Sequence, residues 1–226
     1  MKTTVVLILV TAMSSVIFAQ GNGWSVEGDI EAIFPSDGLW DKGLGGEVKL
    51  INWMSPGFGV GVCAGIANWD IDSDSHQFNP NIVSVINRMQ TWDGDVQYIP
   101  LGVSVFSRTT PSSNGSCFGI EAGLRYMVND SDMKLTNTDT QTSGSSVLTV
   151  TSNHDVDTDD GFVGRIAARA EVPLNGQQGA SLFVTGGYQF DLSTGDARVD
   201  EGGVTYSQDL ELAGFFANIG FAIPLN

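Results

Sequence analysis

Apolar and polar residues alternate along eight separate segments of this chain, each 11 to 15 residues long. A period of two is that of a β-strand whose two faces meet different surroundings. In one of these segments Phe118 and Ile120 alternate with Gly119 and Glu121. The segments are Trp24–Pro35, Leu44–Met54, Phe58–Ile71, Val96–Ser107, Ser116–Val128, Phe162–Leu174, Leu182–Leu192 and Glu211–Leu225. The pattern predicts an all-β fold with eight main strands.

The connections between these segments are alternately long and short. The short ones read "SPG", "TTPSSNG" and "NGQQGA", in which Pro, Asn and Gly favour turns. The long ones are residues 36–43, 72–95, 129–161 and 193–209. This rhythm predicts an up-and-down antiparallel barrel with both termini on the short-turn side.

The long connections hold two further candidate elements. Asn79 and Pro80 can start a short helix that places Ile82, Val85, Ile86 and Met89 on one face. The Ser/Thr-rich region 138–151 is either flexible or, through the stretch "SSVLTVTS", a strand that extends past the barrel rim.

The polar faces of the predicted strands carry charges of both signs between many glycines. A face in water would favour Lys, Thr and Ser, whereas glycines and opposed charges suit the crowded interior of a narrow barrel, in which charges must be paired. A membrane barrel has this polar interior and an apolar exterior. The predicted lumen charges are Glu27, Asp29, Glu31, Glu47, Lys49, Glu121, Arg125, Arg165, Arg169, Glu171 and Asp191. A soluble secreted barrel of the lipocalin type, or a β-sandwich, is the alternative, with the apolar stripes forming its core.

The apolar stripes suit a bilayer, because a tilted strand crosses it with roughly 9–11 residues. Aromatic residues gather near the expected edges and suggest the girdles of a membrane barrel. Trp24, Phe58 and Phe221 would lie at the short-turn rim; Trp69, Tyr126, Tyr188 and Phe190 would lie toward the other rim.

The N-terminus begins with Lys2, continues with the apolar run Val5–Val10 and reaches a cleavable Ala19. This is the pattern of a secretory signal peptide, and an uncleaved anchor is the alternative. We therefore expect a signal peptide over residues 1–19 and one barrel domain over residues 20–226. The net charge of −16 makes nucleic acid an unsuitable partner, because phosphate binding needs a basic patch.

The last strand reads "NIGFAIPLN", in which Asn218, Gly220, Ile223 and Leu225 match the C-terminal assembly signal of bacterial outer-membrane barrels. Over roughly residues 21–226 the chain resembles the eight-stranded barrels of the OmpA transmembrane-domain and OmpX kind. The match departs from that signal in using aliphatic residues and in ending on Asn226. The resemblance implies a Gram-negative outer membrane, periplasmic termini, membrane lipid and the barrel-assembly machinery as partners, and no peptidoglycan-binding domain.

Several groups of side chains are candidates for chemistry. The lumen charges fill the interior or, alternatively, line a narrow ion path. Alternate carboxylates at Asp70, Asp72 and Asp74, and at Asp155, Asp157 and Asp159, are weak candidates for a divalent cation site, because neither run matches an EF-hand loop. His76 and His154 lie in two different long loops, each near an Asp; a rim enzyme would need His154 oriented by a carboxylate and facing a nucleophile or water, and the sequence has no nucleophile motif.

The two cysteines, Cys63 and Cys117, belong to strands separated by another strand. Neighbouring strands lie about 4.8 Å apart, so second neighbours exceed the roughly 7 Å limit for a disulfide. We predict two free thiols facing the lumen.

These observations predict a non-enzymatic barrel without a cofactor, which gives structure to the envelope and interacts through acidic loops. A narrow channel is the first alternative; a rim enzyme and a soluble binding barrel follow.

Overall fold

The computed structural model describes residues 23–36, 40–71, 76–78, 86–130, 132–143, 146–174, 179–193, 195–201 and 204–225. Eight long strands form the barrel: β1 (Trp24–Pro35), β2 (Trp40–Ser55), β3 (Phe58–Ile71), β5 (Ile86–Arg108), β6 (Cys117–Asn129), β10 (Gly161–Pro173), β11 (Ser181–Ser193) and β14 (Gly214–Leu225). No helix among the described residues has the length and apolar character needed to cross a membrane.

Antiparallel pairing closes these eight strands into a barrel. Each barrel strand pairs with the next one along the chain, and β1 pairs with β14 from Trp24↔Leu225 to Pro35↔Gly214. Closure leaves no unpaired edge around the barrel, which is what hydrocarbon surroundings require of a sheet. The predicted fold class is confirmed, and the first and last strands begin and end at the same rim.

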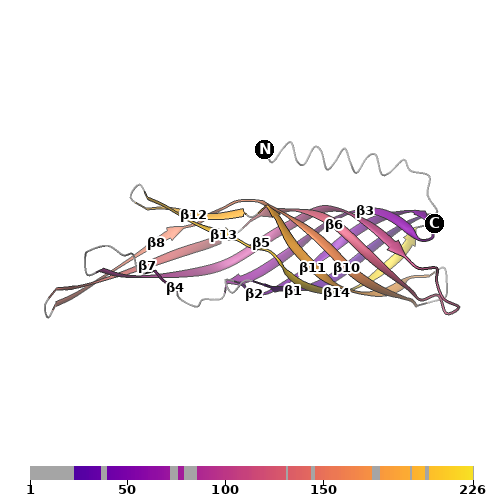
Figure 1. Cartoon of the computed structure of the whole chain (residues 1–226), viewed down its shortest axis with the longest axis horizontal. Helices are drawn as coiled ribbons and strands as arrows, with labels where there is room; N and C mark the ends of the chain where they lie inside the picture. Colours follow the sequence, from indigo (N-terminus) through magenta and orange to yellow (C-terminus); the bar gives the residue numbers. More distant parts are fainter. Residues whose placement is uncertain are drawn as a thin grey trace.

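Shorter strands extend the structure beyond the long-loop rim (Figure 1). They are β4 (His76–Phe78), β7 (Asp132–Ser143), β8 (Ser146–Asp155), β9 (Asp157–Thr158), β12 (Gly195–Glu201) and β13 (Val204–Leu210). The first half of β5 pairs with β7, and β7 pairs with β8; β12 pairs with β13 and β9. We call these strands, with residues 86–95 of β5, the outer extension.

The outer extension tests both predictions made for the long loops. The stretch "SSVLTVTS" lies in β8, so the expectation of a strand past the rim is confirmed. The helix prediction is wrong for Ile86 and Met89, which lie in β5 and pair with Gln141 and Thr138 of β7. Residues 79–85 lie outside the described part of the chain, as do the predicted signal peptide residues 1–19.

The apolar stripes of the barrel strands face outward. Ile30, Phe118 and Phe215 are 66–70% exposed, whereas Glu27, Glu121 and Arg125 from the opposite faces are at most 4% exposed. The predicted inversion, with charge inside and apolar side chains outside, is therefore present. Tyr126 and Tyr188 lie at the long-loop rim and pack against Phe162 and Phe215, with ring centroids 4.8 and 5.0 Å apart.

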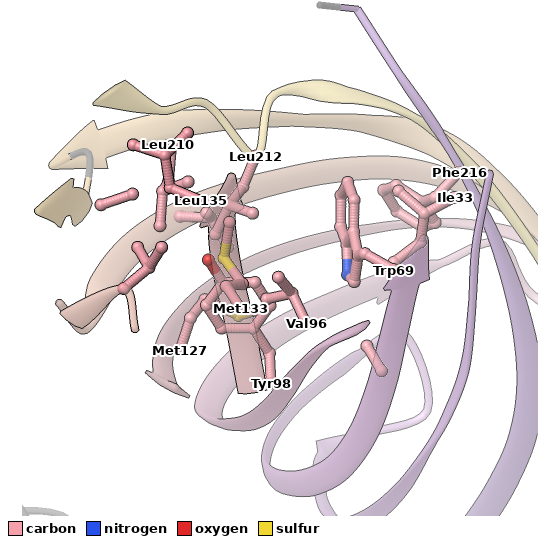
Figure 2. Close-up of a cluster of buried hydrophobic side chains, with 14 of the residues drawn as sticks. Ile33, Trp69, Val96, Tyr98, Met127, Met133, Leu135, Leu210, Leu212 and Phe216 are labelled. Atoms are coloured by element: carbon pink, nitrogen blue, oxygen red, sulfur yellow. The ribbon is translucent and has the colours of Figure 1, made fainter. Parts of the chain in front are cut away.

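The interior nearest the outer extension is apolar (Figure 2). Its buried side chains come from the barrel strands and from the extension and are Ile33, Ala67, Trp69, Val96, Tyr98, Met127, Met133, Leu135, Val156, Val163, Ala167, Ala197, Val199, Leu210, Leu212 and Phe216. We call this set the apolar cap. Trp69, which we expected in the aromatic girdle, instead points inward, is 0% exposed and lies edge-on to Tyr98 at 6.4 Å.

Candidate functional site

The middle of the lumen is filled by ion pairs that meet at Glu47 of β2. Arg125 of β6 donates from Nε and Nη2 to the two oxygens of Glu47 at 2.7 and 3.1 Å. Arg165 of β10 reaches the same carboxylate at 3.4 Å and also pairs with Glu31. Lys49 lies 3.6 Å from Glu47. One carboxylate therefore ties together three cations from three strands.

Two further buried acids pair with the same cations. Glu121 accepts from Arg125 and from Lys49, each at 3.1 Å, and also from the hydroxyl of Ser104 at 2.9 Å. Asp29 lies 3.4 Å from Lys49 and accepts the backbone N–H of Glu47. Charges buried in this way are tolerated only when paired and hydrogen-bonded, and every member here has an opposite charge.

A second group of ion pairs lies nearer the short-turn rim. Arg169 of β10 donates both terminal nitrogens to Glu27 of β1, at 2.6 and 2.8 Å, and one of them to Glu171 at 3.2 Å. Its guanidinium also stacks on Phe183, 3.9 Å from the ring centroid, which adds a cation–π contact. We call the two groups together the ion-pair layer.

Glycines make room for this layer. A Cβ on Gly102 of β5 would lie 2.4 Å from Cδ of Arg125, and one on Gly123 would lie 2.6 Å from Nη1 of the same side chain. A larger residue at either position would require the Arg125 side chain or its neighbours to shift. The glycines that alternate with charges in the sequence therefore mark the strand positions against which long side chains lie.

Ten of the eleven predicted lumen charges lie in the ion-pair layer, and Asp191 lies apart from it. Asp191 stands at the outer end of β11 and accepts the backbone N–H groups of Leu212 and Ala213 at 3.0–3.1 Å. Gln189 of the same strand donates to the carbonyl of Leu212. The two side chains fasten the turn between β13 and β14, so Asp191 holds backbone rather than a cation.

The residues of the predicted assembly signal divide between the two faces of β14. Asn218 points into the lumen and donates to Asp29 at 3.3 Å, and Gly220 lies against the carbonyl of Gly28, where a Cβ would be 2.3 Å away. Ile223 and Leu225 are about half exposed on the outer face. Recognition by assembly machinery remains a prediction.

The acidic loop residues do not converge on a metal site in the described part of the chain, which holds no group of three or more His, Cys, Asp or Glu that could bind an ion. Asp159 pairs with Arg198 at 2.8 Å. Asp155 and Asp157 lie in β8 and β9. Asp72 and Asp74 lie outside the described residues, as does the side chain of Asp70.

Neither the histidines nor the cysteines form a catalytic arrangement that the structure describes. His154 Nε2 lies 3.1 Å from the hydroxyl of Ser152 on β8. Neither His154 nor Ser152 lines any of the three cavities described for the barrel. The side chain of His76 lies outside the described part. Cys63 and Cys117 are buried and free, as predicted.

The apolar cap is the part of the lumen that the sequence analysis missed. The sequence signal for the cap is that the inward-facing residues change from charged to apolar as a strand nears the long-loop rim. The inward face of β6 passes from Glu121 and Arg125 to Met127, and that of β10 passes from Arg169 and Arg165 to Val163. Reading each inward face for its gradient along the barrel axis would have found the cap.

Comparison with solved structures identifies the fold, whereas the sequence comparisons find no match. No protein-family profile matches the chain, and a search of curated protein sequences finds no match. Among solved structures, the outer membrane protein OprG from Pseudomonas aeruginosa matches with a TM-score of 0.54 and 10% identity, over 92% of this chain and 99% of that chain. This chain has the fold of the eight-stranded outer-membrane β-barrels.

Two further solved structures match with lower TM-scores. Neisserial surface protein A matches with a TM-score of 0.48 and 9% identity, over 90% of this chain and 98% of that chain. A major outer membrane protein from Thermus thermophilus matches with a TM-score of 0.47 and 12% identity, over 90% of this chain and 100% of that chain.

Proposed function

We propose that the chain is a non-enzymatic barrel of a Gram-negative outer membrane that anchors the outer extension at the cell surface. Membrane lipid surrounds the apolar belt, both termini lie in the periplasm, and the assembly machinery recognises Asn218, Gly220, Ile223 and Leu225. Lumen closure is the observation that carries this proposal. It favours an anchor over the alternative of a narrow channel.

Two layers close the lumen in series. The ion-pair layer fills the middle of the barrel with side chains that are nearly all buried, and the apolar cap lies between it and the outer extension. Lys49, Arg125 and Arg165 are each held by at least two carboxylates, so moving one of them aside would leave buried charges unpaired. An ion would have to break the charged layer and then cross an apolar one.

The outer extension is strongly acidic. Its strands carry ten acidic and three basic residues, whereas the ion-pair layer together with Arg108 holds six acidic and five basic residues. The short turns carry no charge. The negative electrostatic potential of the outer extension attracts cationic partners and divalent cations and repels a second copy of the same extension.

One strand of the extension is open to a partner. Among the described strands, β8 is the last of its sheet and pairs with β7 alone, and it has no charged residue from Ser146 to Asn153. Val147, Leu148 and Val150 are 54–65% exposed. Natural proteins usually protect such edges with charges, proline or a covering element. We infer that β8 is a contact strand for extended segments of cationic partners, by the mode in which a peptide adds a strand to a sheet.

The anchor proposal predicts a non-conducting barrel. The chain from residue 20 onward, reconstituted in a planar bilayer, is expected to give no discrete conductance steps at either polarity. Insertion is verified in vesicles of the same lipid by the heat-dependent change in gel mobility. Reproducible steps that scale with salt concentration would show an open path and establish the channel alternative.

The contact-strand proposal predicts that charge added to β8 weakens binding of a cationic strand. A labelled peptide of five Lys-Val repeats is titrated onto the barrel in nanodiscs. The double variant Leu148→Lys with Val150→Lys is expected to bind it at least about tenfold more weakly than the variant Asp209→Asn with Glu211→Gln, because both change the net charge equally but only the first lies on the open edge. Equal weakening would mean that the acidic field alone binds the peptide.

A further inference from the structure

A cavity of about 490 Å³ opens at the short-turn end of the barrel. Its walls come from the rim ends of β1, β2, β5, β10, β11 and β14, and Glu27, which pairs with Arg169, is among its lining residues. Its volume lies within the range of small-molecule sites, roughly 300–1,000 Å³. Because the ion-pair layer closes its inner end, this cavity is a blind vestibule rather than part of a path.

Arg108 presents an unused hydrogen-bonding face to this vestibule. Its guanidinium stacks on Trp53, 3.7 Å from the ring centroid, and its Nε donates to the carbonyl of Pro56 at 2.8 Å. These two contacts fix the plane of the group. Its terminal nitrogens make no hydrogen bond to any residue that the structure describes, and the nearest carboxylate oxygen, of Glu171, lies 3.9 Å from Nη1. A fixed guanidinium with free terminal N–H groups suits a carboxylate, which it binds bidentately.

Glu171 presents the opposite charge in the same vestibule. Its Oε2 accepts from Arg169 at 3.2 Å, and its Oε1 accepts no hydrogen bond within the described part of the chain. Its side chain is 12% exposed, so the free oxygen is reachable from the cavity. A guanidinium and a carboxylate therefore stand side by side, each with unused capacity, between apolar walls that include Trp24, Trp53 and Pro224.

We propose that the vestibule binds a small zwitterion, an α-amino acid or short peptide, with its carboxylate on Arg108 and its ammonium on Glu171. The neighbouring carboxylates of Glu27 and Glu171 disfavour a multiply charged anion, and Arg108 disfavours a simple cation. A molecule that carries both charges fills the unused hydrogen-bonding positions of both groups and lays its side chains on the tryptophans. This inference stands apart from the proposed function, because the vestibule lies at the opposite end from the outer extension.

The test is a titration followed by fluorine NMR. The barrel from residue 20 is refolded in detergent with 5-fluorotryptophan, and the Trp53 signal is assigned with Trp53→Phe. Dialanine is expected to shift this signal saturably, with a dissociation constant on the order of 1–10 mM for so small a ligand. N-acetyl-dialanine, which lacks the ammonium, and dialanine amide, which lacks the carboxylate, are each expected to bind at least tenfold more weakly.

Two variants test which residue binds the carboxylate of the ligand and which binds its ammonium. Arg108→Gln is expected to abolish the preference for dialanine over its amide, and Glu171→Gln the preference for dialanine over its N-acetyl form, while Arg198→Gln in the outer extension changes neither. Should either vestibule variant fail to fold, the three ligands on the unaltered barrel still decide. The absence of a saturable shift up to about 50 mM dialanine, well above the expected dissociation constant, or equal affinity for the three ligands, would overturn the proposal.

Discussion

Replacing Glu47 with leucine is expected to destabilise the folded barrel by about 3–5 kcal/mol, because it leaves buried cations without compensation. Glu47 is 4% exposed and pairs with Arg125, Arg165 and Lys49. The free energy of unfolding is measured by urea titration of the barrel in lipid vesicles. Glu211→Leu, at an exposed position beyond the rim, is the matched control and should change stability by less than about 0.5 kcal/mol.

A double variant distinguishes the loss of favourable ion pairing from the cost of leaving a buried cation unpaired. Glu47→Leu combined with Arg125→Leu removes an acid and a base together, and Glu121 keeps its contact with Lys49 at 3.1 Å. Since exchanging a whole buried pair for apolar residues is often neutral, the double variant should recover most of the stability that the single variant loses. If Glu47→Leu alone costs less than about 1 kcal/mol, water reaches these charges and the lumen is not closed at this layer.

Replacing Trp69 with alanine is expected to loosen the outer extension while the barrel remains closed. Trp69 is 0% exposed in the apolar cap, and deleting a buried indole costs about 3–5 kcal/mol. Limited proteolysis in vesicles should cut the β7–β8 hairpin much faster in Trp69→Ala than in the unaltered chain. The barrel strands should stay protected because the ion-pair layer is untouched.

Val147→Ala is the control for Trp69→Ala within the extension. Val147 lies in β8 and is 65% exposed, so its truncation should leave the rate of cleavage nearly unchanged. Equal protection of the hairpin in Trp69→Ala and the unaltered chain would mean that the cap does not hold the extension to the barrel.

The barrel itself was predictable because its signal is local and repeated. Apolar and polar residues alternate with a period of two along each barrel strand, whichever strands lie beside it. Glycines and charges of both signs occur together on one face of each strand, and this indicated which face points inward. Gly123 beside Arg125 illustrates the link, since the small residue and the long side chain occupy the same lumen space. The last strand could likewise be placed because an apolar residue stands at every second position from Phe215 to Ile223.

The outer extension and the apolar cap were harder to predict because long-range pairing decides them. Ile86 and Met89 fit a helical spacing, but their partners in β7 are Gln141 and Thr138, far along the chain, and the ladder overrides the local preference. The polar strand β7 lacks an apolar stripe beyond Met133 and Leu135, so its pattern alone is weak. Trp69 is aromatic, like the residues expected at the rim. Only its position in the alternation, on the inward face of β3, distinguishes it from a girdle residue.

The inverted barrel is tested most directly by refolding the chain from residue 20 with and without amphiphile. In detergent or liposomes we expect a β-rich circular dichroism spectrum and a folded form that migrates differently from the heated sample on a gel. In plain buffer that form should be absent, because the exposed apolar belt of Ile30, Phe118 and Phe215 has no lipid to cover it. A stable monomer folded in plain buffer would contradict the outward placement of the apolar stripes and make them the core of a soluble secreted protein.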